Sequence, residues 1–211
     1  MRKLFLFIVV LPMFANAQSF ELGVNGGISF HSLPAGNIYT HQDKPLSSFV
    51  WNARGDLLLP NAQIGIAIEM TQIDQTNFLA PNYTMKVHDH LAKPLTAPYV
   101  FYNFVKRSSV GYVYGGLMAG GVIAKIGINT EEYSGTVVTG YTTAYNGAFG
   151  YVVGLQAGFV ADLSKHFGVN VEAAMRYVDY NYKDPSTTLP DDPYHYKLFY
   201  FPMTVGLRYR I

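Results

Sequence analysis

The sequence has no cysteine and few charged residues, and both shortages exclude whole classes of protein. Without cysteine there can be no disulfide framework, no thiolate metal site and no thioether-linked lipid anchor. Charged residues make up 14% of the chain and the formal net charge is +1 at pH 7. This balance argues against a nucleic-acid binder, which would need a basic face.

Long apolar runs are also missing after the N-terminal segment. The nearest candidate, 110–124, is interrupted by two glycine pairs and falls short of the roughly 20 residues that a membrane-spanning helix needs. Tyrosine, phenylalanine and glycine are abundant instead, with 17, 14 and 20 copies. No stretch repeats with the period of a helix, so the composition predicts an all-β chain.

Residues 1–17 have the three parts of a secretory signal peptide. Arg2 and Lys3 form a positive start, residues 4–14 are apolar, and a small-x-small cleavage site ends at Ala17. We therefore expect export by the Sec system and cleavage after Ala17.

The rest of the chain, 18–211, suits a single domain. Its last stretch, 199–211, places a large apolar residue at every second position. These residues are Phe199, Phe201, Met203, Val205, Leu207, Tyr209 and Ile211. A period of two is typical of a β-strand with one apolar face. The length exceeds the about 5–6 residues usual in soluble domains and fits a tilted strand that crosses a bilayer.

Similar alternation predicts seven further strands. The eight predicted strands are 20–31, 46–59, 63–73, 94–105, 110–125, 148–163, 168–180 and 199–211. The pattern leaves open the facing of the fourth strand and the register of the fifth. Long connections at 32–45, 74–93, 126–147 and 181–196 alternate with short ones. Short turns at one end and long loops at the other are typical of an outer-membrane barrel.

The placement of charges indicates which face meets lipid. Charged side chains fall opposite the large aliphatic ones on the predicted strands. In a soluble barrel of lipocalin type, the alternative, this face would be the outer surface and would carry far more lysine and glutamate. Here it mixes charges with small residues, which suits the filled interior of an eight-stranded barrel.

These charges predict a network inside the barrel. Its members are Glu21, Arg54, Asp56, Glu69, Glu172, Arg176 and Arg208. We expect Glu172, Arg176 and Arg208 to pair with Glu69, Glu21 or Asp56 across the lumen. Asp162 and Arg210 fall on the same face.

The C-terminal pattern of Thr204, Gly206, Tyr209 and Ile211 is similar to the signal that the barrel assembly machinery reads. On this pattern and its architecture, the chain resembles the small outer-membrane barrels grouped as OmpA/OmpX-like or "porin family", in the single-domain form common in Bacteroidota. We expect no peptidoglycan-binding domain, and Ile211 stands where the family usually has a terminal aromatic residue. The resemblance implies an eight-stranded antiparallel up-and-down transmembrane β-barrel, inserted into the outer membrane of a Gram-negative bacterium by the assembly machinery.

The expected role is structural or adhesive through the long loops, or that of a small porin-like protein. The expected partners are outer-membrane lipid and lipopolysaccharide, the assembly machinery during biogenesis, and a candidate extracellular partner of the loops. We expect a monomer that binds no nucleic acid. A soluble ligand-binding barrel and a lipid-modifying barrel enzyme are the alternatives.

No cofactor, metal or catalytic residue is expected. His-x-His at 88–90 supplies two ligands, whereas a zinc site usually needs three or four. The acidic residues Asp184, Asp191 and Asp192 lack the glycine and glutamate of a calcium-binding loop.

One combination of residues could serve a hydrolase. Ser32 lies beside His31, and Glu131 or Glu132 from another loop could complete a triad. These residues match no known motif, so we do not expect an enzyme.

Overall fold

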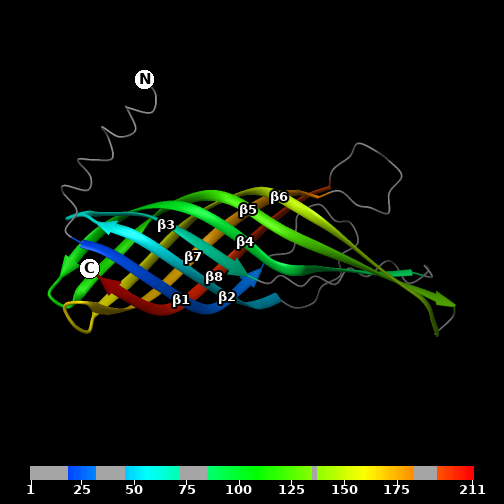
Figure 1. The fold of residues 1–211 in the computed structure, drawn as a ribbon, viewed down its shortest axis with the longest axis horizontal. Helices are drawn as coiled ribbons and strands as arrows, with labels where there is room; N and C mark the ends of the chain where they lie inside the picture. Colours follow the sequence, from blue (N-terminus) through cyan, green and yellow to red (C-terminus); the bar gives the residue numbers. More distant parts are fainter. Residues whose placement is uncertain (1–18, 32–45, 72–84, 135–136, 183–193) are drawn as a thin grey trace, which may run out of the picture.

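The computed structural model of the protein describes residues 19–31, 46–71, 85–134, 137–182 and 194–211, with the backbone alone described for 46, 85–94, 125–134, 137–146, 182 and 194–196. The eight strands are β1 (Ser19–His31), β2 (Leu46–Leu58), β3 (Ala62–Thr71), β4 (Met85–Ser108), β5 (Gly111–Ser134), β6 (Val137–Asp162), β7 (Phe167–Tyr182) and β8 (Tyr194–Arg210). Each strand pairs antiparallel with the next, and β8 pairs with β1, so the sheet closes into the barrel of Figure 1. The predicted eight-stranded antiparallel barrel is confirmed. Within the described ranges, no helix has the length and apolar character needed to cross a membrane.

The strand register makes the barrel narrow and its strands tilted. Following paired residues once around the sheet from Glu21 leads through Asp56, Gly65, Phe101, Met118, Gly154, Arg176 and Tyr200 to His31. The path leaves β1 at position 21 and returns to it at position 31, a stagger of ten residues. Because shear and strand number together set the diameter, eight strands with this stagger enclose a space that side chains can fill.

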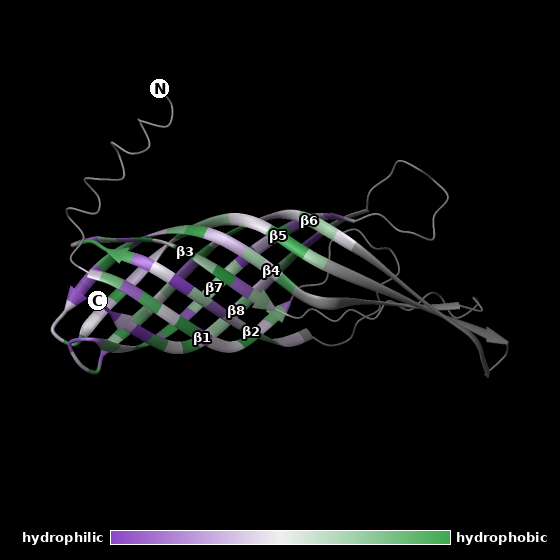
Figure 2. Ribbon diagram, viewed as in Figure 1, coloured by the Kyte–Doolittle hydropathy of each residue, from purple (hydrophilic) through white to green (hydrophobic). Residues whose placement is uncertain are grey.

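The outward face of the barrel is apolar. Leu22, Val24, Ile66, Leu117 and Val205 are each 45–66% exposed, and their neighbours along each strand point inward. Figure 2 shows the resulting alternation of green and purple along the strands. An apolar exterior around a polar interior is the reverse of a soluble barrel, and closure leaves no edge strand in the barrel wall, as a bilayer requires.

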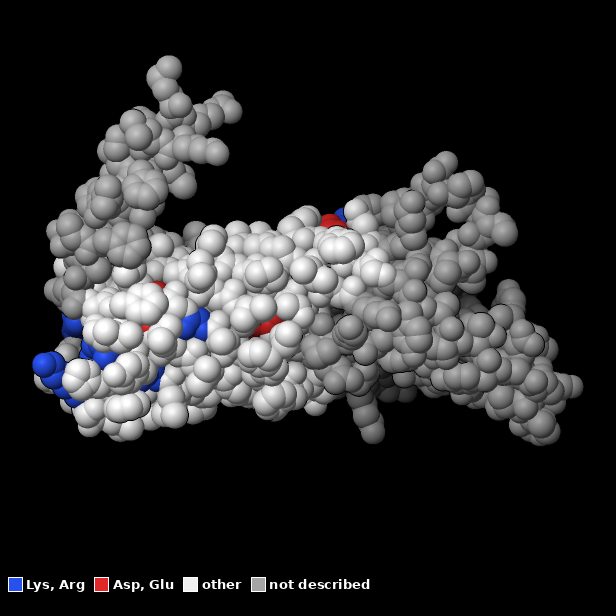
Figure 3. Space-filling view, viewed as in Figure 1, with Lys and Arg blue, Asp and Glu red and all other residues white. Residues whose placement is uncertain are grey.

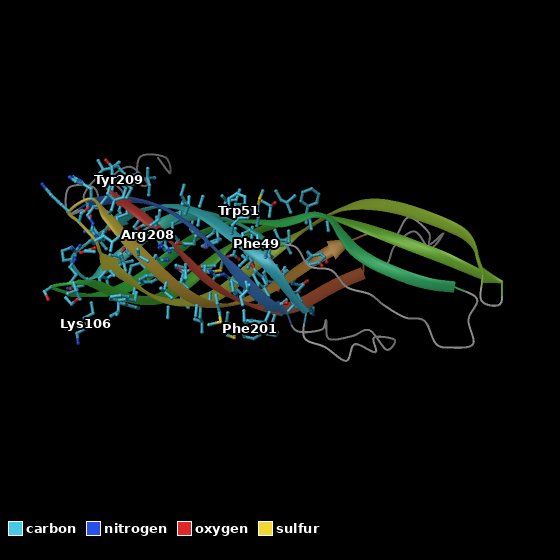
Figure 4. The ribbon with its side chains drawn as sticks, turned by 90° about the horizontal axis from the view of Figure 1, so that it is seen from below. Phe49, Trp51, Lys106, Phe201, Arg208 and Tyr209 are labelled. Atoms are coloured by element: carbon cyan, nitrogen blue, oxygen red, sulfur yellow. The ribbon has the colours of Figure 1, made fainter. Side chains whose placement is uncertain are left out.

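Aromatic residues gather near both limits of this apolar belt. At the end where β1 starts and β8 finishes, which we call the terminal end, the rings of Phe167 and Tyr209 lie 5.1 Å apart. We call the opposite end, where β1 finishes and β8 starts, the hairpin end. Three further outward-pointing aromatic residues lie toward it, namely Phe49, Trp51 and Phe201 (Figure 4). Aromatic girdles at these heights suit the two interfaces of a membrane.

Residues 85–93, 126–134 and 137–147, expected to be parts of the long loops 74–93 and 126–147, are strand, so the prediction is wrong for these residues, while 74–84 lie outside the described residues. Residues 85–94, 125–134 and 137–146 continue β4, β5 and β6 as a three-stranded sheet that projects beyond the barrel (Figure 1). Beyond the membrane both faces of a sheet meet water, so the chain can keep its ladder of hydrogen bonds without alternating apolar residues. The period-two signal therefore disappears while the strands continue.

Connections at the terminal end are short. They comprise residues 59–61, 109–110 and 163–166. Gly111, at the start of β5, has a φ of 140°, and a Cβ there would lie 1.9 Å from the Val160 carbonyl oxygen. Only glycine fits this close approach, which permits the tight turn from β4 to β5.

Candidate functional site: the filled interior of the barrel

All seven residues predicted for the charge network point into the barrel and are buried. They come from β1, β2, β3, β7 and β8, and none is more than 4% exposed. The sequence places them there because each occupies the position next to an outward aliphatic residue on its strand. Their burial requires partners, since an unpaired charge out of water is costly.

Arg54 lies at the centre of the network. Its Nε donates to Asp56 Oδ1 at 3.0 Å, and its Nη1 donates to Glu172 Oε2 at 2.9 Å. Its Nη2 donates to Gln63 Oε1 at 3.0 Å, and the guanidinium lies 4.0 Å from the centre of the Phe101 ring. Every nitrogen of this guanidinium therefore has a partner, as a buried arginine needs.

Arg176 joins the network from β7 in the direction of the hairpin end. Its Nη2 lies 3.6 Å from Glu69 Oε2 and 3.8 Å from Glu172 Oε1. Its Nη1 donates to the Leu155 carbonyl at 3.1 Å. The Tyr200 hydroxyl donates to the other Glu69 oxygen at 2.6 Å. This arginine thus links β3, β6 and β7 through the lumen.

Arg208 and Glu21 lie closer to the terminal end. Arg208 Nη1 is 3.5 Å from Asp56 Oδ1, and its side chain lies so close over Gly23 that a Cβ there would be 2.4 Å from Nη1. Glu21 accepts hydrogen bonds from the Tyr112 hydroxyl and from Arg210 Nε, the latter at 2.8 Å. These contacts hold β8 against β1, where the barrel closes.

The network is close to balanced in charge. Four arginines, at 54, 176, 208 and 210, face five carboxylates, at 21, 56, 69, 162 and 172. Of the expected partners, Arg176 reaches Glu69 and Arg208 reaches Asp56, whereas Glu172 pairs with arginines and Glu21 pairs with Arg210. This arrangement fills and cross-links the lumen, although Nε and Nη2 of Arg208 have no hydrogen-bond partner among the described residues.

Sequence reasoning missed the neutral polar residues that complete the network. They are Asn25, Asn52, Gln63, Asn103, Tyr112, Tyr114, Gln156 and Asn170. Tyr114, for example, donates from its hydroxyl to Glu172 Oε2 at 2.7 Å. The members on β4 and β5 could have been predicted only if it had been known which face of each strand points inward. Both strands carry aromatic or apolar residues on both faces, so alternation does not identify the inward face.

The other half of the interior is largely apolar, which was not predicted, although Ser29, His31 and Thr71 are buried there as well. A buried cluster toward the hairpin end includes Leu95, Val122, Val152, Val178 and Leu198. It begins beside the charge network, where Phe101 lies against Arg54 and Tyr99 lies against Arg176, and it continues toward the hairpin end. A second, smaller cluster of Leu58, Val105, Tyr112, Tyr114 and Val160 lies toward the terminal end.

The four residues of the predicted assembly signal lie on β8 and just after it. Thr204 points inward, Gly206 lies against Asn25 of β1, and Tyr209 points outward beside Phe167. Ile211 is 68% exposed, and its backbone N donates to the Phe20 carbonyl at 2.8 Å.

The remaining candidate sites gain no support. Residues 1–17 and the acidic positions 184, 191 and 192 lie outside the described residues, as do Ser32 and the side chains of 88–90, 131 and 132. His31 points inward, and its Nε2 lies 2.6 Å from Ser48 Oγ on β2. Among the residues with described side chains, no three His, Asp or Glu lie together as metal ligands.

No protein-family model matches the chain, and no curated protein matches its sequence. Solved structures of similar fold include Neisserial surface protein A, at 10% identity and a TM-score of 0.46 over 91% of this chain and 97% of that one. The attachment invasion locus protein Ail of Yersinia pestis gives 12% identity and a TM-score of 0.45 over 92% and 98%. Outer-membrane protein W of Escherichia coli gives 15% identity and a TM-score of 0.43 over 90% and 97%. The fold itself is established by the closed register of the eight strands.

Proposed function

We propose that this protein is an integral outer-membrane barrel, closed to ions, that anchors a projecting sheet outside the cell. The observation that carries the proposal is the pairing of an apolar, lipid-facing exterior with an interior in which seven charged side chains are buried, each in a salt bridge. A soluble ligand-binding barrel would need the opposite arrangement of faces.

The route to the membrane is part of the proposal. A signal peptide, 1–17, would direct Sec export and be cleaved after Ala17, and the barrel assembly machinery would read Thr204, Gly206, Tyr209 and Ile211. The terminal end would then face the periplasm, because both ends of the barrel domain lie there with the short turns. Lipopolysaccharide would surround the hairpin end.

The role outside the cell is structural or adhesive. The extensions of β4, β5 and β6 carry backbone far beyond the apolar belt, where an extracellular partner could reach it. A barrel filled with paired charges serves such a sheet as a rigid anchor. The single-domain, Bacteroidota-type assignment belongs to this proposal, as does the expectation of a monomer.

Membrane fractionation and a cell-binding assay test the proposal. The protein should be found in the outer-membrane fraction, and its unheated form should migrate differently from the heated form on a gel. Replacing residues 126–146 by a short turn should abolish binding to host cells or to neighbouring bacteria while leaving the barrel in the membrane. Recovery of the intact protein in the soluble periplasmic fraction would contradict the membrane assignment.

A small porin is the second candidate, since the lumen is lined with polar residues. Planar-bilayer recordings separate the two, because a filled lumen should give no current steps above background. The expected lack of enzymatic activity stays a prediction. A mass shift of lipid A that depends on the gene would contradict it.

A further inference from the structure

The lipid-facing surface has an apolar groove. It has a volume of about 720 Å³ and crosses the outer face from β3 to β7. Val100 and Tyr102 of β4 form one wall, Val153 and Leu155 of β6 form the other, and Ala119 leaves space between them. Such a groove on a membrane-facing surface is filled by an acyl chain.

The wall formed by β4 leads to a cationic end. Val100, Tyr102 and Phe104 are exposed and point outward, and Lys106 continues the same row at the terminal end. Arg107 follows it and is also exposed, but alternation places it on the row of the inward residues Asn103 and Val105. Figure 3 shows Lys and Arg gathered at this end of the molecule, and Figure 4 shows Lys106 there.

This positive charge has little opposition. Lys165, in the turn between β6 and β7, adds a further exposed cation at the terminal end. The only exposed acidic residue among those described at this end is Asp162, and Arg210 Nη2 lies 3.2 Å from it. No described carboxylate forms a salt bridge with Lys106, Arg107 or Lys165.

We propose that this face binds an anionic phospholipid of the leaflet at the terminal end, with an acyl chain in the groove and the headgroup phosphate at Lys106. Cations at the headgroup level attract anionic lipids, and a lysine on a lipid-facing row reaches that level with its long side chain. A second copy of the chain is a poorer occupant, because a symmetric contact across this face would bring the two Lys106 rows together.

Tryptophan quenching by brominated lipid measures the local lipid composition. Trp51 is the only tryptophan and lies toward the hairpin end, so Trp51→Phe combined with Phe104→Trp moves the reporter next to Lys106. The protein is folded into vesicles of phosphatidylcholine with a minority of phosphatidylglycerol, and one lipid at a time is brominated. We expect phosphatidylglycerol to be enriched about fivefold beside the Phe104→Trp reporter, the factor that one cation near the surface supplies.

Three comparisons decide the outcome. Lys106→Gln should abolish the enrichment, Lys197→Gln at the hairpin end should leave it, and added salt should weaken it because the charge is exposed. Quenching by brominated phosphatidylcholine shows that the barrel is inserted, so a missing lipid preference is not confused with a failure of the membrane assignment. Equal quenching by the two lipids beside Lys106, or an enrichment that survives Lys106→Gln, would overturn the proposal.

Discussion

The two halves of the barrel interior are filled in different ways. Toward the terminal end, Arg54, Asp56 and Glu172 form a network in which each charged atom needs a partner at a defined position. Toward the hairpin end, Leu198 and Val178 belong to an apolar cluster with no such pairing. Both halves close the lumen, but a charged network depends on every partner, whereas an apolar layer depends on volume.

The difference has a consequence for robustness. Removing one member of a buried charge network leaves its partners uncompensated, so the loss exceeds that of a lost contact. Removing methyl groups from the apolar layer leaves a cavity that the surroundings can partly fill. The charged half should therefore be the more sensitive to substitution.

Arg54→Leu should produce the largest loss of stability. Asp56 and Glu172 would each lose their closest cation, which should lower the free energy of unfolding by about 4 kcal/mol. Urea unfolding in lipid vesicles, followed by the fluorescence of Trp51, measures the change. Arg107→Leu, at an exposed position, is the matched control and should have little effect.

A double variant separates charge from packing. Adding Glu172→Gln to Arg54→Leu should recover part of the loss, because one uncompensated carboxylate is removed. A simple sum of the two single losses would show that the pair does not act as a unit.

Leu198→Ala should cost about 3 kcal/mol, because it opens a cavity in the apolar half. The same unfolding measurement applies, with Val205→Ala on the lipid-facing side as control. Val205 is 57% exposed, so shortening it leaves no internal cavity. A loss at Leu198 larger than that of Arg54→Leu would reverse the ranking of the two halves.

The sequence predicted one half of the interior better than the other, for a physical reason. On β1, β2, β7 and β8 one face is apolar and the other polar, so alternation assigns Glu21 and Arg176 to the inside directly. On β4 both faces are aromatic or aliphatic. Tyr99 and Phe101 point inward while Val100 and Tyr102 point outward. No period-two pattern distinguishes two apolar faces, so the apolar layer could not be foreseen.

The alternation of apolar and polar residues also does not predict which charged side chains pair or how far the strands extend. Alternation predicts only that Arg208 and Asp56 both point inward. The stagger of ten residues around the barrel determines that these two side chains form a salt bridge. The extensions at 125–134 and 137–146 carry no alternation, because the bilayer no longer imposes it.

Tyr200→Phe tests the boundary where the two halves meet. Tyr200 is buried within the apolar cluster, and its hydroxyl donates to Glu69 Oε1 at 2.6 Å. Losing a hydrogen bond to a buried carboxylate should lower the free energy of unfolding by about 2 kcal/mol. Tyr102→Phe on the outer face is the matched control. An unchanged stability for Tyr200→Phe would mean that Arg176 alone satisfies Glu69.

Thr204→Val should have the smallest effect on stability and separates folding from assembly. The Thr204 hydroxyl is buried, and no hydrogen-bond partner lies among the described residues, so an isosteric apolar side chain should change the free energy of unfolding by less than about 0.5 kcal/mol. If Thr204 belongs to the assembly signal, the amount of barrel in the outer membrane of living cells should nevertheless fall. Thr204→Ser, which keeps the hydroxyl, should restore that amount. A loss of stability comparable to that of Tyr200→Phe would instead place Thr204 in the polar network, and normal amounts in the membrane would remove it from the signal.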